Sequence, residues 1–344
     1  MNYKIKKSNL FILIFIVGLI LFVLLRKDFA QIIAHLGNIN IAWTSLGVVC
    51  IAVYWIIEAR TLHLILNAYD KEFSYWKVLK LVITTQFFNG VTPFSSGGQP
   101  FQILILSKNS KLKVSNITSA IIHNFILYQV MLVFMGLVAI ILENVFQLFP
   151  IDTVNLKWLS LIGFGLNFLI ILVLIIIAVS SKLTGKMLRF VYFLIHWSPF
   201  RKRLSNIREK IELTVHDFHN DILLLMQDRK MYVRVLILNF VKLLSYYMIA
   251  YFICRAVGLH SISVIQAVIA SAYVMLITSV VPLPGGSGGA ELGFLIFFAA
   301  FVSGPHATAI MILWRIITYY LGMAIGLMTL NFGYSSEQKS ETTA

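Results

Sequence analysis

The sequence predicts an all-α integral membrane protein with about six full spans and two broken or re-entrant helical hairpins. Of its 344 residues, 59% are hydrophobic and 12% are charged, and the mean hydropathy is +0.86. A soluble domain carries about 25% charged residues, so this composition is typical of a membrane protein. The chain also contains several apolar runs that reach the roughly 20 residues a helix needs to cross a bilayer. Two further apolar regions are interrupted by glycine and proline clusters.

Six apolar runs are long enough to span the membrane alone. We place these spans near residues 9–25, 41–66, 117–142, 157–180, 231–257 and 307–332. The first run follows a basic N-terminus but lacks a small-residue cleavage site, so we expect it to be retained as a helix. The interrupted regions, 78–107 and 264–302, have half-segments that are mostly too short to span, and we predict a hairpin for each. Residues 1–332 then form one transmembrane domain, and 333–344 form a short tail.

Loop charges predict the orientation of the chain in the cell membrane. Lysines and arginines concentrate before the first span, in the 68–80 and 108–113 loops, and between 182 and 230. The 143–156 loop contains Glu143 and Asp152 but no Lys or Arg. Positive charge favours the cytoplasmic side, so both termini are predicted to be cytoplasmic. The pair Arg26–Lys27 is the exception, because this arrangement places it outside.

Residues 201–230 have the pattern of an amphipathic helix, with apolar residues recurring at spacings of three and four. This helix is either a structural connector on the cytoplasmic face or a docking site for an envelope lipid-modifying enzyme. Its histidines, His216 and His219, lie beside acidic residues but lack further ligands, so we predict no metal site. We expect no cofactor either.

The formal net charge of +14 is not a sign of nucleic-acid binding. The cations lie beside the apolar spans, where the positive-inside bias and anionic lipids account for them. The two cysteines, Cys50 and Cys254, lie inside apolar runs and are predicted to pack as small apolar side chains. We therefore expect no nucleic-acid partner, and the oligomeric state is open.

The two interrupted regions contain matching breaks. The stretch "TPFSSGGQP" covers residues 92–100, and "LPGGSGGAEL" covers residues 283–292. Aligning Pro93 with Pro284 places a glycine pair at the same offset in both. The predicted orientation makes the first hairpin enter from the cytoplasm and the second from outside. Such a pair indicates inverted repeats around a substrate site near the membrane midplane.

A broken backbone at membrane depth must be buried in protein or line a wet cavity, because lipid cannot satisfy its N–H and C=O groups. Glycines permit positive φ, and helices that restart after a break present free N–H groups that suit a phosphate. Tight turns without a ligand are the alternative. The candidate substrate-binding residues are Pro93, Ser95, Ser96, Gly97, Gly98, Gln99, Pro284, Gly285, Gly286, Ser287, Gly288, Gly289, Glu291 and Arg315.

Two charged residues near the second break sharpen this prediction. Glu291 directly follows the break, and Arg315 lies in the middle of a span. Both are costly in hydrocarbon unless paired or hydrated, so we expect an Arg315–Glu291 ion pair. Glu291 has the alternative role of stabilising the first turn of a helix, and Arg315 that of contacting a lipid phosphate.

Six further polar residues in the spans are secondary candidates: Glu58, Arg60, His123, Asn124, Lys242 and Tyr319. Glu58 and Arg60 are expected to extend to the cytoplasmic interface, with a functional role as the alternative. His123 and Asn124 are interhelical contacts or part of a proton path. Lys242 lies deep in a span and remains a candidate.

Two motif matches carry no function here. Ser287 in "GGSGG" fits the G-x-S-x-G pattern of hydrolases, but that motif requires a strand–turn–helix and a following acid and histidine. Gly322 and Gly326 form a G-x-x-x-G pattern, which permits close packing of helices.

The segments "TPFSSGGQP", "PLPGGSGGAE" and "LWRIITYYLG" resemble the transmembrane, flippase-like domain family of lysylphosphatidylglycerol synthases. The resemblance covers roughly residues 10–332. It implies a polytopic membrane protein that moves a lipid or lipid-linked substrate between leaflets. Long members of the family carry a separate soluble aminoacyltransferase domain, and only a short tail follows the last predicted helix here.

We therefore expect a flippase-like protein that binds the head group of an anionic phospholipid or a polyprenyl-phosphate-linked lipid. A transporter is favoured over an enzyme. The enzyme alternative is a phosphatidylglycerol lysyltransferase, with the link to antibiotic resistance that the family implies. A second alternative is a membrane scaffold for an envelope lipid enzyme.

Overall fold

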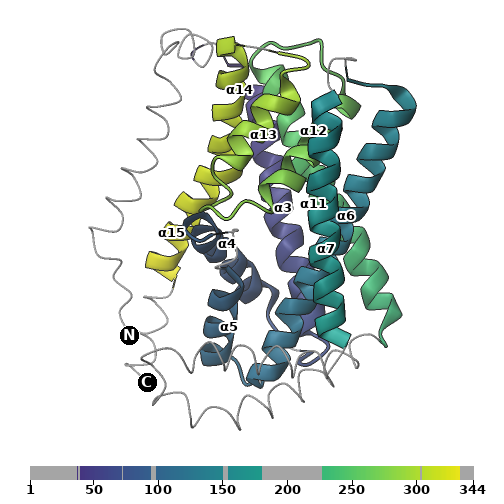
Figure 1. Ribbon diagram of the computed structural model, residues 1–344. Helices are drawn as coiled ribbons and strands as arrows, with labels where there is room; N and C mark the ends of the chain where they lie inside the picture. The colour runs from purple at the N-terminus through teal and green to yellow at the C-terminus, as the bar shows by residue number, and fades with distance from the viewer. Residues whose placement is uncertain are drawn as a thin grey trace, which may run out of the picture.

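In the computed structural model, residues 37, 39–71, 73–93, 98–149, 154–179, 227–302 and 304–333 are described. Their regular structure is helical, as predicted (Figure 1). In chain order the helices are α3 (Ile41–Leu66), α4 (Tyr75–Val91), α5 (Gly98–Asn109), α6 (Val114–Phe146), α7 (Val154–Val179), α11 (Arg229–Ala256), α12 (Val264–Thr278), α13 (Gly289–Phe298), α14 (Gly304–Arg315) and α15 (Leu321–Gly333). The predicted span 9–25, most of the amphipathic segment 201–230 and residues 334–344 of the tail lie outside the described residues.

Five stretches are long and apolar enough to cross a membrane, and each matches a predicted span. They are α3, α6, α11, the Trp158–Ile176 part of α7, and the continuous stretch Gly304–Asn331. Polar caps mark several starts. The Asn40 side chain accepts hydrogen bonds from the backbone of Ala42 and Trp43, and Asp228 accepts one from Met231. The multi-pass architecture is therefore confirmed for the described part of the chain.

α3 and α11 form the central antiparallel pair of the bundle. The backbone N–H of Asn40, at the start of α3, donates to the carbonyl of Ala256, at the end of α11. The two helices therefore share an end of the molecule. Their contact buries Ile51, Leu243, Ile249 and Ile253 in the main hydrophobic cluster, which also contains α12, α13 and α14 residues.

The two predicted hairpins are present, and they enter from opposite ends. α4 follows the Leu66 end of α3, whereas α12 follows the Ala256 end of α11, which lies beside Asn40 at the other end of α3. Figure 1 shows α4 and α5 in the lower half and α12 and α13 in the upper half. Opposed hairpins are what the loop charges predicted. Inverted repeats, which would require the two halves to superpose, remain a prediction.

The last predicted span is interrupted by a π-helical turn, Ile316–Tyr320, which separates α14 from α15. α15 packs closely on α4 through the predicted G-x-x-x-G pair. A Cβ added at Gly326 would lie 2.8 Å from the carbonyl oxygen of Ile83 and 2.8 Å from the backbone nitrogen of Phe87. Backbone atoms cannot yield as a side chain can, so a glycine is required for this contact.

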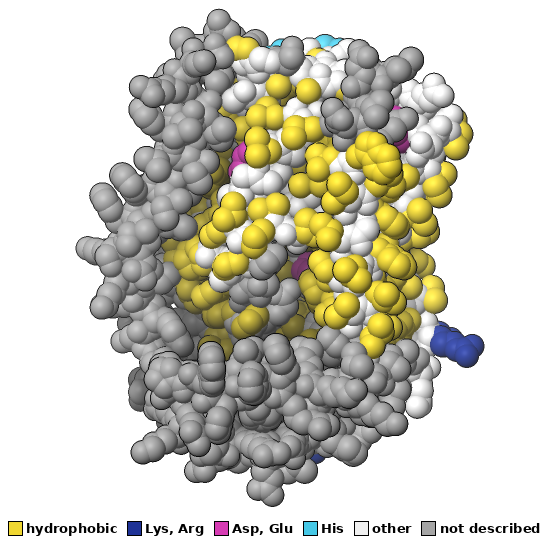
Figure 2. Space-filling view, in the orientation of Figure 1, with side chains coloured by type: hydrophobic (Ala, Val, Ile, Leu, Met, Phe, Trp, Pro, Cys, Tyr) yellow, Lys and Arg dark blue, Asp and Glu magenta, His cyan; other side chains and the backbone are white. Residues whose placement is uncertain are grey.

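The outer surface suits a lipid environment. On the face in Figure 2, hydrophobic side chains cover much of the described surface between the two ends. The exposed apolar side chains include Leu161, Ile162, Phe168 and Leu169 of α7 and Val233 and Ile237 of α11. Soluble proteins rarely expose so large a continuous apolar patch, so this surface is typical of one that faces lipid.

Candidate functional site

The two breaks meet each other directly. Pro93 and Pro284 form an isolated antiparallel bridge, and the N–H of Gly285 donates to the carbonyl of Thr92 over 3.4 Å. This contact joins the tips of hairpins that begin at opposite ends of the bundle. The sequence predicted two related breaks, and in the structure they form one junction.

The second break is a tight turn built on glycine. Gly285, Gly286 and Gly288 all have positive φ, and Gly286 N–H donates to the carbonyl of Leu283. Gly285 has a second constraint, because a Cβ there would overlap the ring of Tyr319. The backbone conformation and the lack of space both require glycine at this position.

The first break is held by Asn89, near the end of α4. Its Oδ1 accepts a hydrogen bond of 3.0 Å from the backbone N–H of Gly98, at the start of α5. A Cβ at Gly98 would overlap both Thr85 and Asn89, so the two halves of this hairpin also touch through glycine. The candidates Ser95, Ser96 and Gly97 lie outside the described residues.

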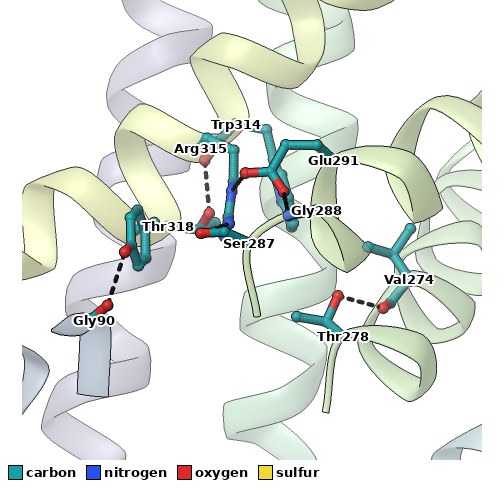
Figure 3. Close-up of polar contacts among 10 residues, drawn as sticks. Gly90, Val274, Thr278, Ser287, Gly288, Glu291, Trp314, Arg315 and Thr318 are labelled. Carbon is teal, nitrogen blue, oxygen red and sulfur yellow. Dashed lines mark hydrogen bonds and ion pairs between the residues drawn. The ribbon is translucent and has the colours of Figure 1, made fainter. Parts of the chain in front are cut away.

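The predicted Arg315–Glu291 ion pair is confirmed. Arg315 Nε donates to Glu291 Oε1 over 2.7 Å, and both side chains are buried (Figure 3). Glu291 also fulfils its alternative role, because its Oε2 accepts a 2.6 Å hydrogen bond from the N–H of Gly288 at the start of α13. One carboxylate therefore balances the arginine and the helix N-terminus together.

The guanidinium of Arg315 keeps part of its hydrogen-bonding capacity. Nε binds Glu291, and Nη2 donates to the Ser287 hydroxyl over 3.4 Å. Nη1 has no hydrogen-bond acceptor among the residues that the structure describes. The group lies 4.6 Å from the centre of the Tyr319 ring and 5.8 Å from that of Trp314. Arg315 is thus ordered on three sides and retains open N–H donors.

Tyr319 links the junction to α4. It lies in the π-helical turn, and its hydroxyl donates to the carbonyl of Gly90 over 2.8 Å. That carbonyl belongs to the last turn of α4, where helical partners are missing. Tyr319 therefore contacts both breaks, through Gly90 on one side and Gly285 on the other.

A cavity of about 480 Å³ lies against this junction. Its walls include Gln99 of the first break, Gly285 of the second, Arg315 and Tyr319. On α3 the lining residues are Ile51, Tyr54, Trp55 and Glu58, which occupy the middle of a 26-residue helix. The cavity therefore lies in the middle of the bundle along its long axis, within the size range of small-molecule sites.

Glu58 faces this cavity, and the expectation that it extends to the membrane interface is wrong. Its carboxylate forms an ion pair with Lys242 and accepts a 3.3 Å hydrogen bond from Asn124. Lys242 is completely buried, 4.4 Å from the centre of the Tyr128 ring. A buried ammonium requires a counter-charge, so α11 holds Glu58 inside the bundle.

Two other secondary candidates lie away from the cavity. Arg60 is exposed and contacts His63 Nδ1 over 3.2 Å, as expected for an interfacial side chain. His123 forms a hydrogen bond with Tyr232 of α11, which makes it an interhelical contact. Gln129, by contrast, lines the cavity, and its amide donates to Asn167 of α7 over 2.8 Å.

Several cavity residues were not singled out from the sequence. They are Tyr54, Thr85, Gln86, Asn89, Gln102, Tyr128, Tyr246, Thr278, Ser279 and Thr318. These residues could have been found in the sequence only by selecting every polar residue that lies in an apolar span. An uncharged polar side chain is common in a transmembrane helix, where it can hydrogen-bond to a neighbouring helix. The sequence alone therefore gives no reason to select any one of them.

The arrangement defines a class: a polytopic membrane protein with two opposed hairpins of short helices beside a polar cavity. The family model of the lysylphosphatidylglycerol synthase transmembrane region matches residues 9–326, and the chain belongs to this family. The chain is 23% identical to a "UPF0104 membrane protein" of Archaeoglobus fulgidus over 81% of this chain and 83% of the relative. It is likewise 23% identical to a "UPF0104 membrane protein" of Methanothermobacter thermautotrophicus, over 92% and 89%.

Proposed function

We propose that the protein binds a phosphate-bearing lipid head group in the central cavity and moves it between leaflets. The observation that carries this proposal is the junction of two opposed helix breaks, Pro93 with Pro284, beside a cavity lined by Arg315. Broken helices at this depth are tolerated where they line a polar cavity, and transporters bind their substrates there.

Arg315 is the proposed anion-binding residue. Its Nε donates to Glu291, while Nη1 offers donors toward a ligand. A planar guanidinium binds phosphate oxygens well, and it stays charged at any physiological pH. Glu291 holds the guanidinium in place and occupies the α13 N-terminus. The phosphate is therefore proposed to contact Arg315 rather than that helix end.

The hairpins supply the path. Each half-membrane hairpin is short, with 17 and 12 residues in α4 and α5 and 15 and 10 in α12 and α13. Because they enter from opposite ends, movement of either one would open the cavity to one leaflet at a time. This is the geometry of alternating access around a fixed site.

The test is lipid translocation in proteoliposomes that contain the purified protein. Arg315→Ala and Gly289→Leu should both abolish translocation, the first by removing the phosphate contact and the second by overlap with Val281 beside the break. Arg60→Ala and Gly165→Leu are the matched controls, because Arg60 is exposed and a Cβ at Gly165 meets nothing within 4 Å. Wild-type rates in both test variants would refute the site assignment.

The family name also raises the lysyltransferase alternative. Incubation of the protein with lysyl-tRNA and phosphatidylglycerol separates the two activities. We expect no aminoacylated lipid, and its formation would replace the transport proposal with an enzymatic one.

A further inference from the structure

The cavity wall contains several carboxamides. Six of its residues are Asn or Gln: Gln86, Asn89, Gln99, Gln102, Asn124 and Gln129. A carboxamide has both donors and an acceptor, so it suits a partner that can donate and accept in turn. A phosphate ester ionised at neutral pH only accepts hydrogen bonds, so it could pair with Arg315 and with amide N–H groups but not with the amide oxygens. The cavity wall therefore suits a ligand that carries hydrogen-bond donors in addition to a phosphate.

Most of these amides already have protein partners on one side. Asn89 accepts from Gly98, Gln86 donates to Val82, and Gln129 donates to Asn167. The Oε1 of Gln99 and the Oδ1 of Asn124 are different, because they are buried and accept no hydrogen bond from the described part of the chain. An unsatisfied buried acceptor is unfavourable, so a ligand that donates here would be stabilised.

The charged residues beside the cavity indicate which kind of hydrogen-bond donor the ligand carries. An ammonium donates hydrogen bonds but would need a counter-charge. The carboxylate on the wall, Glu58, is already paired with Lys242 and bound by Asn124, and Glu291 is paired with Arg315. A cation in the cavity would meet the guanidinium of Arg315 without a free carboxylate among the described residues. Uncharged hydroxyl groups satisfy the same acceptors at no electrostatic cost.

Four tyrosines also line the cavity. They are Tyr54, Tyr128, Tyr246 and Tyr319, and the rings of Tyr54 and Tyr246 lie 5.5 Å apart. A tyrosine presents an apolar face and a polar tip. A polyhydroxylated ring has the matching surface, with C–H groups on its faces and hydroxyls at its rim.

We infer that the head group in this cavity is polyhydroxylated and joined to its lipid through a phosphate. The phosphate contacts Arg315, and the hydroxyls contact Gln99, Asn124 and the tyrosine wall. This inference rests on the proposed function for the lipid and its phosphate, and it adds the chemistry of the head group. Two sources carry that chemistry: a sugar on a polyprenyl phosphate, and a polyol phospholipid such as phosphatidylinositol.

The experiment measures lipid binding by native mass spectrometry and lipid movement in proteoliposomes. The probes are polyprenyl-phosphoryl hexose, phosphatidylinositol, phosphatidic acid as a phosphate without hydroxyls, and phosphatidylethanolamine as an ammonium lipid. Wild-type protein should bind at least one of the hydroxylated lipids at least about tenfold better than either of the others. Whichever hydroxylated lipid binds better identifies the source.

The variants Gln99→Leu and Asn124→Leu should each reduce that preference by about fivefold, as expected for one lost hydrogen bond. Asn144→Leu is the matched control, because Asn144 is an exposed carboxamide at the end of α6 whose amide donates to the carbonyl of Ile140 in its own helix. Size-exclusion profiles like that of wild type establish that the variants are folded. Tyr54→Phe, which removes one hydroxyl from the tyrosine wall, replaces either variant that is not.

The two ideas fail in different ways. Equal binding of phosphatidic acid and the hydroxylated lipids, unchanged in Gln99→Leu and Asn124→Leu, would overturn the head-group inference even if lipids move. Preferential binding that depends on Gln99 and Asn124, without movement of any lipid, would support the inference and overturn the translocase proposal. Preferential binding of phosphatidylethanolamine would also overturn the inference.

Discussion

At the scale of single residues, two ion pairs flank the cavity and differ in their surroundings. The Lys242 side chain is 0% exposed, whereas its partner Glu58 is 21% exposed toward the cavity. Arg315 and Glu291 are both nearly buried, at 6% and 8%. The consequence of breaking a pair depends on which charge is left behind, because Glu58 is the more exposed member of its pair, whereas Lys242 has no access to water.

This asymmetry predicts the stability of two variants. Glu58→Gln leaves the buried ammonium of Lys242 without its counter-charge and should cost roughly 3–5 kcal/mol. Lys242→Met should cost less, because the remaining Glu58 carboxylate keeps its Asn124 contact and the cavity can hydrate it. Thermal unfolding of both variants in detergent measures the difference. A larger loss for Lys242→Met would show that Glu58 is not hydrated in this way.

A second prediction concerns the contact between Gly285 and Tyr319. Gly285→Ala should lower stability through both its positive φ and overlap with the Tyr319 ring. Gly304→Ala is the control, because Gly304 has nearly the same φ, 63° against 60°, and no atom within 4 Å of an added Cβ. The control should lose about 1–2 kcal/mol from backbone strain alone, and Gly285→Ala should lose more.

The second-site variant Tyr319→Ala separates the two causes of the stability loss, which are backbone strain and overlap with the Tyr319 ring. Added to Gly285→Ala, it removes the overlap and should recover the part of the loss that exceeds the control, measured by the same unfolding experiment. If the double variant is no more stable than Gly285→Ala after allowing for Tyr319→Ala alone, the two residues do not interact as the structure places them.

At the scale of elements, the sequence predicted the spans and the hairpins well. Apolar runs near the bilayer length and glycine–proline breaks are strong local signals, so α3, α6 and α11 begin and end within a few residues of the predicted bounds. The Arg315–Glu291 pair was also predictable, because a charge in mid-span has few neighbours that can neutralise it.

The cavity wall could not be predicted in the same way. Tyr54, Tyr128, Tyr246 and Gln86 come from four helices, and nothing in the surrounding sequence distinguishes them from other polar residues of the spans. Which face of a helix points inward is decided by packing with its neighbours. Glu58 was misjudged for the same reason: it lies two turns before the end of α3, but Lys242 on another helix holds it inside.

At the scale of the whole molecule, the central feature is the opposed entry of the two hairpins. The 67–74 loop that leads into α4 and the 257–263 loop that leads into α12 lie at opposite ends of the α3–α11 pair. The charges of the loops predict that the first of these ends is cytoplasmic. This orientation follows from the loop charges alone.

Thiol labelling tests this arrangement in intact cells. Cysteines introduced one at a time, at Lys71 and at His260, should react with a membrane-impermeant reagent from opposite sides. We expect His260→Cys to be labelled from outside. Native Cys254 is buried and Cys50 is only partly exposed, so the background should be low. Labelling of both positions from the same side would contradict the opposed hairpins, and labelling of Lys71→Cys alone from outside would invert the predicted orientation.

The central claim is that a phosphate-bearing lipid head group occupies the cavity between the two breaks. Lipid mass spectrometry on the purified protein tests it most directly, with Thr318→Trp to fill the cavity and Leu172→Trp as a control on the exposed face of α7. We predict that wild type and Leu172→Trp retain the same phosphate-bearing lipid and that Thr318→Trp loses it. Equal retention of that lipid by a folded Thr318→Trp variant would contradict the claim.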